Sequence, residues 1–503
     1  MRDAHRYNAV RRIADIAEQG SRLWPDAVAI IDDSGSWSFL QLHRAAGRAA
    51  AWLYDRGVHG GDRVLLVGEN CRPFVALYLG AAVLDAMPVL LNANQTAADI
   101  ERIRHHADAR CVVYAAVTSK AQRLAEAAGA AFHQVDDLGA IGLAAVETDA
   151  RPEAVAPNPS DRIAALIYTS GSEGEPKGVM LSNANLLFAA RVSGELRKLA
   201  PGERLYGVLP LTHSLGLSVV TLGTLLHGAT LRQTAQFNPA AMLAALESEG
   251  ISVLIGMPMM YQLLAEFAQR KGRKRLVVPI LRVISVAGAP LTPAVKEETE
   301  ALFGLPLHNG YGVTECSPTI SQTSLEAPRR DCSVGRVWPG VEVRLNLPDS
   351  EGAGEILVRG PNVMRGYYRD PGLTAAAIDS EGWFNTRDLG RFDQEDNLFI
   401  VGRSRELIIR FGYKVLPAEI EVTLERHPHI ARCAVIGVSR MGNDEIVAFL
   451  QAASEATPTD SELASYCAQY LPAYKQPSRF IWVSSFPLTV AGKIRKGELA
   501  AQL

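Results

Sequence analysis

Short β-rich runs alternate with amphipathic stretches between residues 162 and 315, and this alternation leaves few architectures open to the chain. The expected helices begin at good capping residues, Ser182, Asn238 and Thr292, the last two followed by a proline that suits the first helical turn. Such alternation predicts βαβ units and a largely parallel sheet. We expect its strands at AALIYTS, RLYGVLPL, ISVLIGMP, LRVISVAGAP and LPLHNGYG.

The regions before and after these residues have different sequence patterns. Before residue 162 strands and helices alternate in the same way, with strands expected at RVLLVGEN, MPVLLN and CVVYA. After residue 315, short strands and glycine-containing turns predict a small β-barrel-like subdomain, and after GRSRE (402–406) strands and helices mix at the length of a separate domain. We therefore predict an α/β fold. Residues 1–404 would form a large N-terminal domain of two βαβ-type subdomains plus the β subdomain, and residues 405–503 a small mobile α+β C-terminal domain.

Charge and cysteine content exclude several classes of protein. The 503 residues include 51 Lys+Arg and 54 Asp+Glu, a net charge of −3, which argues against nucleic-acid binding through bulk positive charge. The six cysteines are widely spaced and include no CxxC pair, as is typical of free thiols in a reducing compartment. The first twenty residues lack an apolar signal core, so we expect a cytoplasmic protein without stable membrane insertion.

The segment YTSGSEGEPKGVMLS (168–182) is the first with clear chemical content. Its small hydroxyl and glycine residues let backbone N–H groups turn toward an anion, and Lys177 adds a positive charge, so the segment suits a polyphosphate between a strand and a helix. It is not a Walker A loop, because Pro176 precedes the lysine and Gly178 follows it. Taken alone, the segment fits a flexible surface turn equally well.

Three further segments contain residue types that suit a nucleotide. NGYGVTECSP (309–318) offers an aromatic ring for a base, Thr314 for a phosphate and Glu315 as a hard ligand for Mg²⁺. GWFNTRDLG (382–390) contains Asp388, which suits a ribose diol, and PLTVAGKIRKGEL (487–499) places Lys493 on an expected loop. Two of them have a structural alternative when taken alone: Glu315 as a satisfied glutamate at a strand end, and Lys493 as a solvated lysine.

In this order and spacing, the four segments resemble the adenylate-forming superfamily, which contains acyl- and aryl-CoA synthetases, luciferases and the adenylation domains of peptide synthetases. The resemblance runs from DRVLLVGEN to PLTVAGKIRKGEL, and its motifs are most similar to those of acyl-CoA synthetases and 4-coumarate-CoA-ligase-like enzymes. It implies an acid–thiol ligase. Such an enzyme uses ATP and Mg²⁺ to convert a carboxylic acid into an acyl-adenylate with release of pyrophosphate, and then forms a thioester with coenzyme A.

The resemblance also implies roles for individual residues. Glu315 would bind Mg²⁺, Thr314 would touch the α-phosphate, and Lys493 would bridge the substrate carboxylate and the α-phosphate. The hinge would lie at Arg405, and the thiol channel would pass Gly412, Tyr413 and Lys414. The remaining ATP-binding residues would be Thr169, Ser170, Gly171, Ser172, Gly174 and Lys177 for the β- and γ-phosphates, Gly288, Ala289, Pro290, Asn309, Gly310, Tyr311 and Gly312 around the adenine, and Asp388 and Arg403 at the ribose.

Two positions depart from the family pattern. Glu173 stands where the phosphate loop usually has a second threonine, which puts a negative charge beside a triphosphate. Arg387 stands where the family has the glycine of Thr-Gly-Asp; if that position needs positive φ, the arginine strains the turn, and otherwise it adds a cation near the nucleotide. A degenerate nucleotide-binding protein without turnover is therefore one alternative reading.

The segment PLTHSLGL (210–217) bears on the substrate. It contains no acid that could pair with an α-amino group, which disfavours a free amino acid. His213 matches a histidine that lies at the mouth of the acyl pocket in acyl- and aryl-CoA ligases, although it could be a partly buried structural residue. Medium-chain fatty acids and aromatic acids both fit the apolar wall that we expect from Leu217, Val220, Val286, Val313 and Cys316.

The remaining possibilities differ in the thiol that accepts the acyl group. The basic run QRKGRKR (269–275) suits the phosphates of coenzyme A or the acidic surface of an acyl carrier protein, and such runs are most often solvated. Fatty-acid AMP ligases that load carrier proteins carry an insertion before the hinge domain, and this compact chain leaves little room for one. We therefore expect coenzyme A as acceptor, with a carrier protein as the alternative, and a monomer or homodimer.

Overall fold

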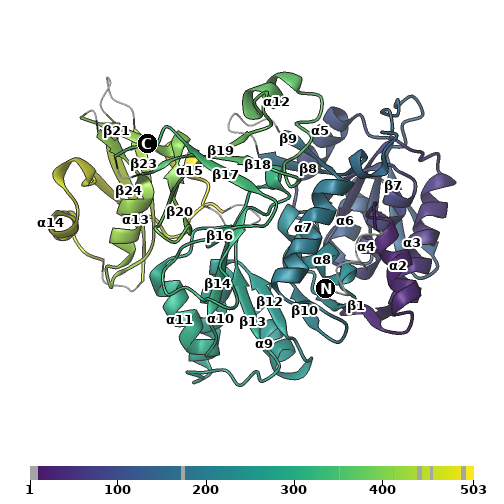
Figure 1. Cartoon of the computed structure of the whole chain (residues 1–503), viewed down its shortest axis with the longest axis horizontal. Coiled ribbons are helices and arrows are strands. Elements are labelled where there is room, and N and C mark those ends of the chain that lie inside the picture. The colour runs from purple at the N-terminus through teal and green to yellow at the C-terminus, as the bar shows by residue number, and fades with distance from the viewer. Residues whose placement is uncertain are drawn as a thin grey trace.

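The computed structural model describes residues 10–170, 176–350, 352–411, 413–438, 444–453, 457–488 and 494–503 (Figure 1). The fold is α/β, with a large N-terminal part and a smaller C-terminal part that has sheets of its own, as the sequence predicted. All six cysteines are unpaired, which confirms the expectation of free thiols. Among the described helices, none has both the length and the apolar character that crossing a bilayer requires.

The first sheet is built mainly from residues 63–182 and has the strand order β6-β7-β5-β3-β4-β8-β9. Its central strands pair in parallel, and the predicted strands RVLLVGEN, MPVLLN and CVVYA all lie in it. Strand β3 is buried along its whole length, as expected for a strand with helices on both faces. The strands are β3 (Arg63–Gly68), β4 (Met87–Asn92), β5 (Cys111–Ala115), β6 (Ala131–Val135), β7 (Gly139–Ala144), β8 (Ile163–Ser170) and β9 (Pro176–Ser182). The helices around it are α3 (Phe39–Tyr54), α4 (Arg72–Val83), α5 (Ala97–Ala107) and α6 (Ser119–Ala127).

The second sheet has nine strands, in the order β16-β15-β14-β13-β12-β10-β11-β1-β2. Pairing is parallel from β14 through β1, so the carboxyl ends of β13 and β14 lie at one edge. The strands are β1 (Val28–Asp32), β2 (Gly35–Ser38), β10 (Arg204–Gly207), β11 (Thr230–Gln233), β12 (Val253–Gly256), β13 (Val283–Val286), β14 (Leu307–Tyr311), β15 (Ser321–Gln322) and β16 (Arg336–Val337). The hairpin β1–β2 is an addition that the sequence pattern did not predict.

The three predicted capping residues begin helices of this part of the fold. Ser182 forms a capping box with Asn185, Asn238 accepts hydrogen bonds from two backbone N–H groups, and Thr292 accepts one. These bonds satisfy N–H groups that have no partner within the helix. The helices are α2 (Asp15–Leu23), α7 (Asn183–Leu196), α8 (Gly223–Leu226), α9 (Pro239–Ser248), α10 (Pro258–Arg270) and α11 (Pro293–Phe303).

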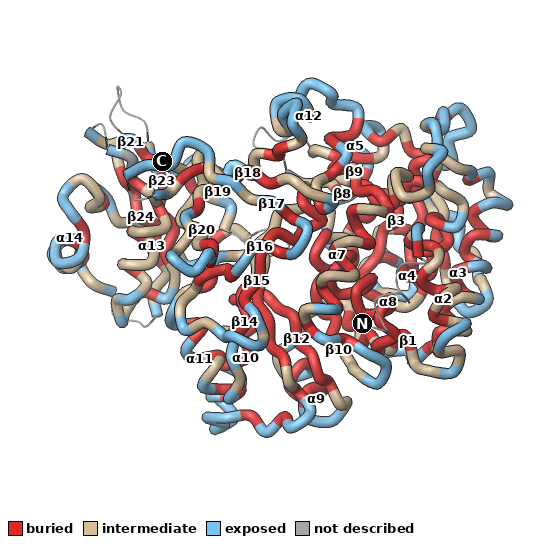
Figure 2. The backbone as a smooth tube through the Cα atoms, in the orientation of Figure 1, coloured by how far each residue is buried: buried red, intermediate tan, exposed pale blue. Residues whose placement is uncertain are grey.

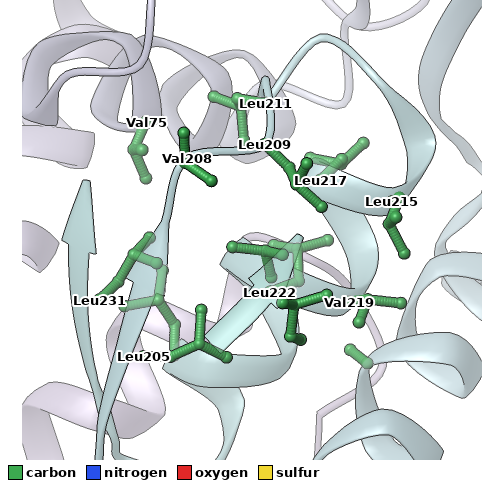
Figure 3. Packing of buried hydrophobic residues seen from close by; sticks show 14 of the residues in the cluster. Val75, Leu205, Val208, Leu209, Leu211, Leu215, Leu217, Val219, Leu222 and Leu231 are labelled. Atoms are coloured by element: carbon green, nitrogen blue, oxygen red, sulfur yellow. The ribbon is translucent and has the colours of Figure 1, made fainter. Parts of the chain in front are cut away.

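A π-helix from Leu215 to Leu222 packs against the second sheet and is buried throughout. Figure 3 shows leucine side chains of this helix facing Leu205 of β10 and Leu231 of β11, with Val75 of α4 nearby. This packing belongs to one continuous apolar cluster that extends across both large sheets, seen as the buried centre of Figure 2. The π-helix places the end of the segment PLTHSLGL in the core of the large N-terminal part.

Beyond residue 340 the chain forms smaller sheets. An antiparallel meander follows the order β17-β18-β19-β20, which is the small β region that the sequence predicted. Two separate apolar clusters consist only of residues from Ile408 onward. The strands are β17 (Glu342–Asn346), β18 (Gly354–Arg359), β19 (Phe384–Phe392), β20 (Leu398–Arg403), β21 (Ile408–Arg410), β22 (Tyr413–Val415), β23 (Ile430–Val438), β24 (Glu445–Ala452) and β25 (Arg479–Trp482). The helices are α12 (Pro371–Ala377), α13 (Pro417–Glu425), α14 (Asp460–Tyr470) and α15 (Lys496–Ala500).

Candidate active site

The expected phosphate loop lies in a hairpin between β8 and β9. Thr169 pairs with Lys177, and Ser170 pairs with Pro176, at the end of the hairpin that adjoins the loop. Gly171, Ser172, Glu173 and Gly174 lie outside the described residues. Lys177 is the second residue of β9, and pairing with β8 fixes its backbone.

A helix follows this segment at Ser182, as predicted, but the sequence did not predict the strand that precedes the helix. Strand β9 lies between the loop and α7, because Val179 and Leu181 are buried on the sheet while Met180 is more exposed, a pattern typical of a strand. At about 3.3 Å per residue, a strand of this length separates the loop from the helix by roughly 20 Å. The dipole of α7 acts only near its own first turn, at the far end of β9 from Lys177.

Glu315 lies in a single 3₁₀ turn, Thr314–Cys316, directly after the carboxyl end of β14. Its Oε1 atom accepts a hydrogen bond of 2.9 Å from the Tyr367 hydroxyl. The Nζ atom of Lys177 lies 6.0 Å from the centre of the Tyr367 ring, within reach of a cation–π interaction. Lys177 and Glu315 thus both lie beside the Tyr367 side chain, although they are 138 positions apart in the sequence.

Sequence reasoning missed Tyr367. The signal was the run RGYY (365–368), which lies between predicted elements and carries no charged group other than Arg365. Tyr367 is buried, and burial together with the Glu315 charge raises the pKa of its hydroxyl above the ordinary value. The hydroxyl therefore remains a hydrogen-bond donor at physiological pH.

Thr314 is brought next to the segment PLTHSLGL. The hydroxyl of Ser214, which is completely buried at the start of the π-helix, lies 3.3 Å from the Thr314 hydroxyl and donates to it. His213 is half-buried, and its Nδ1 atom accepts a hydrogen bond of 3.3 Å from the Leu215 N–H. This bond makes Nδ1 an acceptor, so the neutral ring carries its proton on Nε2.

Tyr311 at the end of β14 joins the expected adenine region to the expected ribose region. Its hydroxyl donates a hydrogen bond of 2.7 Å to Oδ2 of Asp388, and Nε of Arg403 lies 2.9 Å from Oδ1. Asp388 and Arg403 are direct partners in the register of β19 and β20. Burial, together with the Asp388 charge, raises the pKa of Tyr311 well above its ordinary value. The structure therefore brings these three predicted residues together.

The remaining residues of the expected adenine region lie at the carboxyl edge of the second sheet, where open α/β sheets bind ligands. Val286 of β13 pairs with Asn309 of β14, and the turn at Gly288, Ala289 and Pro290 follows directly. The side chain of Asn309 donates to the carbonyl oxygens of Cys332 and Ser333, at 3.0 and 3.3 Å. Gly310 continues β14 beside these residues.

Gly312 shows why this edge needs a glycine. A Cβ atom at this position would lie 1.2 Å from the carbonyl oxygen of Pro318. Any larger residue would push apart the two arms of the turn that carries Thr314 and Glu315. Gly312 is therefore required by close packing of the backbone.

The five residues expected to form the acyl pocket belong to or pack against the main apolar cluster: Leu217, Val220, Val286 and Cys316 are buried, and Val313 is partly buried. Burial raises the pKa of the Cys316 thiol well above its ordinary value, so this cysteine is a poor nucleophile. The contribution of these side chains to acyl binding stays a prediction.

Arg387 occupies the left-handed region with a φ of +61°. Its N–H donates to Asn385 Oδ1 at 2.9 Å, and its guanidinium, on an exposed side chain, lies 3.9 Å from a carboxylate oxygen of Glu355. The first of the two possibilities raised by the sequence therefore holds: an arginine occupies a position that favours glycine, and the turn beside Asp388 is strained.

The predicted hinge residue Arg405 is exposed in a one-turn 3₁₀ helix, Ser404–Glu406, between β20 and β21. Lys496 joins this turn to the C-terminal part, since its Nζ atom lies 2.8 Å from both Glu406 and Glu421. Although burial raises the pKa of Glu406, the Lys496 ammonium lowers it below the ordinary value overall.

Two predicted residues of the C-terminal part, Lys493 and Gly412, lie outside the described residues, and Lys414 is described only as a position in β22. Tyr413 is exposed, and its ring stacks on that of Tyr474 at a centroid distance of 4.3 Å. Of the three residues expected to line the thiol channel, the structure therefore describes the side chain of Tyr413 alone.

Comparison with known families finds two matches that together cover most of the chain. Residues 17–368 match the family described as AMP-binding enzyme, and residues 419–493 match the AMP-binding enzyme C-terminal domain. Asp388 and Arg403 lie in the stretch between the two matches, whereas Glu315 and Tyr367 lie in the first.

Individual proteins are similar over nearly their whole length. 4-coumarate–CoA ligase 2 of Oryza sativa subsp. japonica is 30% identical, with 95% of this chain and 90% of the relative covered. A feruloyl-CoA synthase of Amycolatopsis sp. is 31% identical, with 95% and 96% covered. Among solved structures, ATP-bound MatB from Rhodopseudomonas palustris aligns with a TM-score of 0.84 at 27% identity, and covers 97% of this chain and 98% of its own.

Proposed function

This chain belongs to the family of AMP-binding, adenylate-forming enzymes, and we propose that it activates an aromatic carboxylic acid for transfer to coenzyme A. The reaction class is that of an acid–thiol ligase. ATP and the acid give an acyl-adenylate and pyrophosphate, and the thiol of coenzyme A then displaces AMP to give the thioester.

One observation carries the assignment of residues: two polar groups from distant parts of the chain meet at the end of β14. The first contains Tyr311, Asp388 and Arg403, and the second contains Glu315 and Lys177 on either side of Tyr367. We assign the first group to the adenosine and the second to the phosphates, because a buried carboxylate suits a ribose diol and a cation suits a polyphosphate.

The residues present fit a magnesium ion. Glu315 offers a hard carboxylate, and its Oε2 atom has no hydrogen-bond partner among the described residues. We propose that Glu315 holds Mg²⁺, which would neutralise part of the phosphate charge when bound. Lys177 would hold the β- and γ-phosphates, and Thr314, held by Ser214, would donate to the α-phosphate.

In the first step, an oxygen of the substrate carboxylate attacks the α-phosphorus while the bond to pyrophosphate breaks. Both reactants are anions, so positive charge must be placed between them, and we assign this to Lys493. In the second step, the sulfur of coenzyme A attacks the acyl carbonyl, its proton passes to solvent, and AMP leaves. Water must be kept from the reactive anhydride in the interval.

We further propose that residues 405–503 move as a unit about Arg405 between the two steps. Three observations support this division: Arg405 is exposed, the apolar clusters beyond Ile408 contain no residue from the larger part, and Lys496 ties Glu406 to Glu421 on the C-terminal side. The movement would withdraw Lys493 and bring the β21–β22 hairpin, with Tyr413, to the incoming thiol.

The choice of an aromatic acid rests on two supports. The expected acyl wall is apolar, and no acidic residue lies in the segment 210–217 that could pair with an amino group. The names of the two relatives given above contain 4-coumarate and feruloyl, which are phenylpropenoic acyl groups. We therefore place phenylpropenoic acids before medium-chain fatty acids as substrates of this chain.

The test is carboxylate-dependent exchange of pyrophosphate into ATP over a panel of phenylpropenoic, benzoic, medium-chain fatty and dicarboxylic acids. We expect the fastest exchange with a phenylpropenoic acid, and a thioester by mass spectrometry when coenzyme A is added. Faster exchange with octanoate than with any aromatic acid would refute the substrate proposal. Thioester formation only on a holo acyl carrier protein would refute the acceptor, and no exchange with any acid would indicate a nucleotide-binding protein without turnover.

A further inference from the structure

We propose that Tyr367 is a positioning residue that fixes the Glu315 carboxylate relative to the strand carrying Lys177, and so sets the place of the divalent cation against the phosphates. This inference rests on the proposed function, since it takes Glu315 as the cation ligand. It concerns a residue that touches neither ATP nor the acid in the roles assigned above.

The segment 365–368 extends the first sheet. The N–H of Met180 donates to the Gly366 carbonyl, and the N–H of Arg365 donates to the Met180 carbonyl, both at 3.0 Å. The N–H of Tyr368 donates to the Gly178 carbonyl at 2.7 Å, and Val179 forms an antiparallel bridge with Tyr367. Figure 1 shows α12 close to β9 where this segment leads into it. The segment is therefore fixed to the strand that follows the phosphate loop.

The chain at residues 364–367 also holds Glu315, which follows a strand of the second sheet. The N–H of Met364 donates to the Glu315 carbonyl at 2.8 Å, and the Tyr367 hydroxyl donates to Glu315 Oε1 at 2.9 Å. One bond fixes the backbone and the other fixes the carboxylate. A short segment thus connects the cation ligand of one sheet to the phosphate-binding strand of the other.

The tyrosine is itself held in place. Its side chain is buried, its N–H donates to the Thr374 hydroxyl at 2.9 Å, and its ring lies beside the Lys177 ammonium. Gly366 precedes it with a φ of +135°, and a Cβ there would lie 2.7 Å from Thr374. The backbone at this point has little freedom, so the hydroxyl position is determined by the fold.

The chemical consequence follows from how carboxylates bind cations. A bond from Tyr367 to Oε1 orients the Glu315 plane and leaves Oε2 for the cation. Partners that orient metal ligands in this way typically change metal affinity by about 10- to 100-fold when they are removed. Loss of the hydroxyl should therefore weaken cation binding, while the fold and the contacts to the adenosine are retained.

The test compares Tyr367→Phe with Tyr368→Phe as a matched control. Tyr368 is the neighbouring buried tyrosine, and its hydroxyl donates to Glu153 at 2.7 Å, away from Glu315. We would titrate Mn²⁺ into each protein saturated with α,β-methylene-ATP and follow bound Mn²⁺ by electron paramagnetic resonance. We expect the dissociation constant of Mn²⁺ to rise roughly tenfold in Tyr367→Phe and less than about twofold in Tyr368→Phe. Thermal unfolding of both variants checks that they fold.

The same titration in a Glu315→Gln background separates positioning from general damage. There, Tyr367→Phe should change Mn²⁺ binding by less than about twofold, because the carboxylate that it orients is absent. Equal effects of the two Tyr→Phe variants, or the same loss in both backgrounds, would overturn the inference. If the wild-type protein binds Mn²⁺ with the nucleotide and Tyr367→Phe binds it equally well, only this inference fails. If the wild type binds no Mn²⁺ with the nucleotide, the proposed function fails first.

Discussion

Replacing Tyr311 with phenylalanine removes one hydroxyl from the group that joins β14 to β19 and keeps the aromatic ring. The lost bond is short, 2.7 Å, and its acceptor, Asp388, is only 4% exposed. Hydrogen bonds to charged groups contribute about 1.5–3 kcal/mol net to stability. Asp388 keeps its contact with Arg403 at 2.9 Å, so the carboxylate is not left without a partner. We therefore expect Tyr311→Phe to lower the free energy of unfolding by about 2 kcal/mol.

The assay is urea unfolding followed by tryptophan fluorescence, in the wild-type and in an Asp388→Asn background. With a neutral acceptor, the tyrosine hydrogen bond is worth about 1 kcal/mol, so the two substitutions should show a coupling of about 1 kcal/mol. The reasoning would be refuted if Tyr311→Phe lowered the free energy of unfolding by less than about 0.5 kcal/mol, or equally in both backgrounds.

Three further predictions concern other parts of the chain. Arg387→Gly should relieve strain, because the left-handed conformation costs about 1–2 kcal/mol for a residue that carries a side chain. The variant should therefore unfold at a higher urea concentration than Arg387→Ala. Unfolding of Arg387→Gly at a lower urea concentration than Arg387→Ala would contradict the strain. Lys493→Ala should abolish carboxylate-dependent exchange yet largely spare thioester formation from supplied acyl-AMP; equal loss of both half-reactions would contradict two conformations. Burial, assisted by Glu421, raises the pKa of Glu425 from 4.5 to about 7. A carboxyl group whose pKa is raised by folding stabilises the fold at low pH, and this contribution is lost as the pH rises from about 4.5 to 7. The melting temperature should therefore fall over this pH range in the wild type, and it should fall less in Glu425→Gln.

Local patterns predicted the elements of this fold well. The run RVLLVGEN contains β3, CVVYA is β5, and the capping residue Ser182 begins α7. In each case the signal lies within a few residues: apolar runs rich in β-branched residues predict strands, and a hydroxyl that can accept from the third residue predicts a helix start. Such signals do not depend on where the rest of the chain goes.

The features that the sequence did not predict depend on distant contacts. Strand β9 follows a glycine-rich loop and becomes a strand by pairing with β8. Tyr367 donates a hydrogen bond to Glu315, which lies 52 residues earlier, and no local pattern indicates this contact. The π-helix at Leu215–Leu222 likewise reflects packing in the core, where one extra residue per turn is tolerated.

The predicted site was partly placed by the structure. Tyr311, Asp388 and Arg403 were expected around one nucleoside and do lie in contact. The loop containing Gly171, Ser172 and Gly174, and the residue Lys493, lie outside the described residues, so their roles stay predictions. Motif spacing can bring residues to one site, but it cannot give the partner that orients each of them, as Ser214 orients Thr314.

The pairing of β1 with β11 has a consequence for synthesis of the protein. Ile30 faces Leu231 in this parallel pair, so the first strand to leave the ribosome needs a partner made about 200 residues later. At roughly 5–20 residues per second, that delay is about 10–40 s. Until then β1 has only β2, which follows it directly in the chain, as a strand partner, and its other edge stays unpaired. An unpaired strand edge can associate with other chains, and apolar association weakens on cooling, so we expect growth at lower temperature to raise the soluble yield.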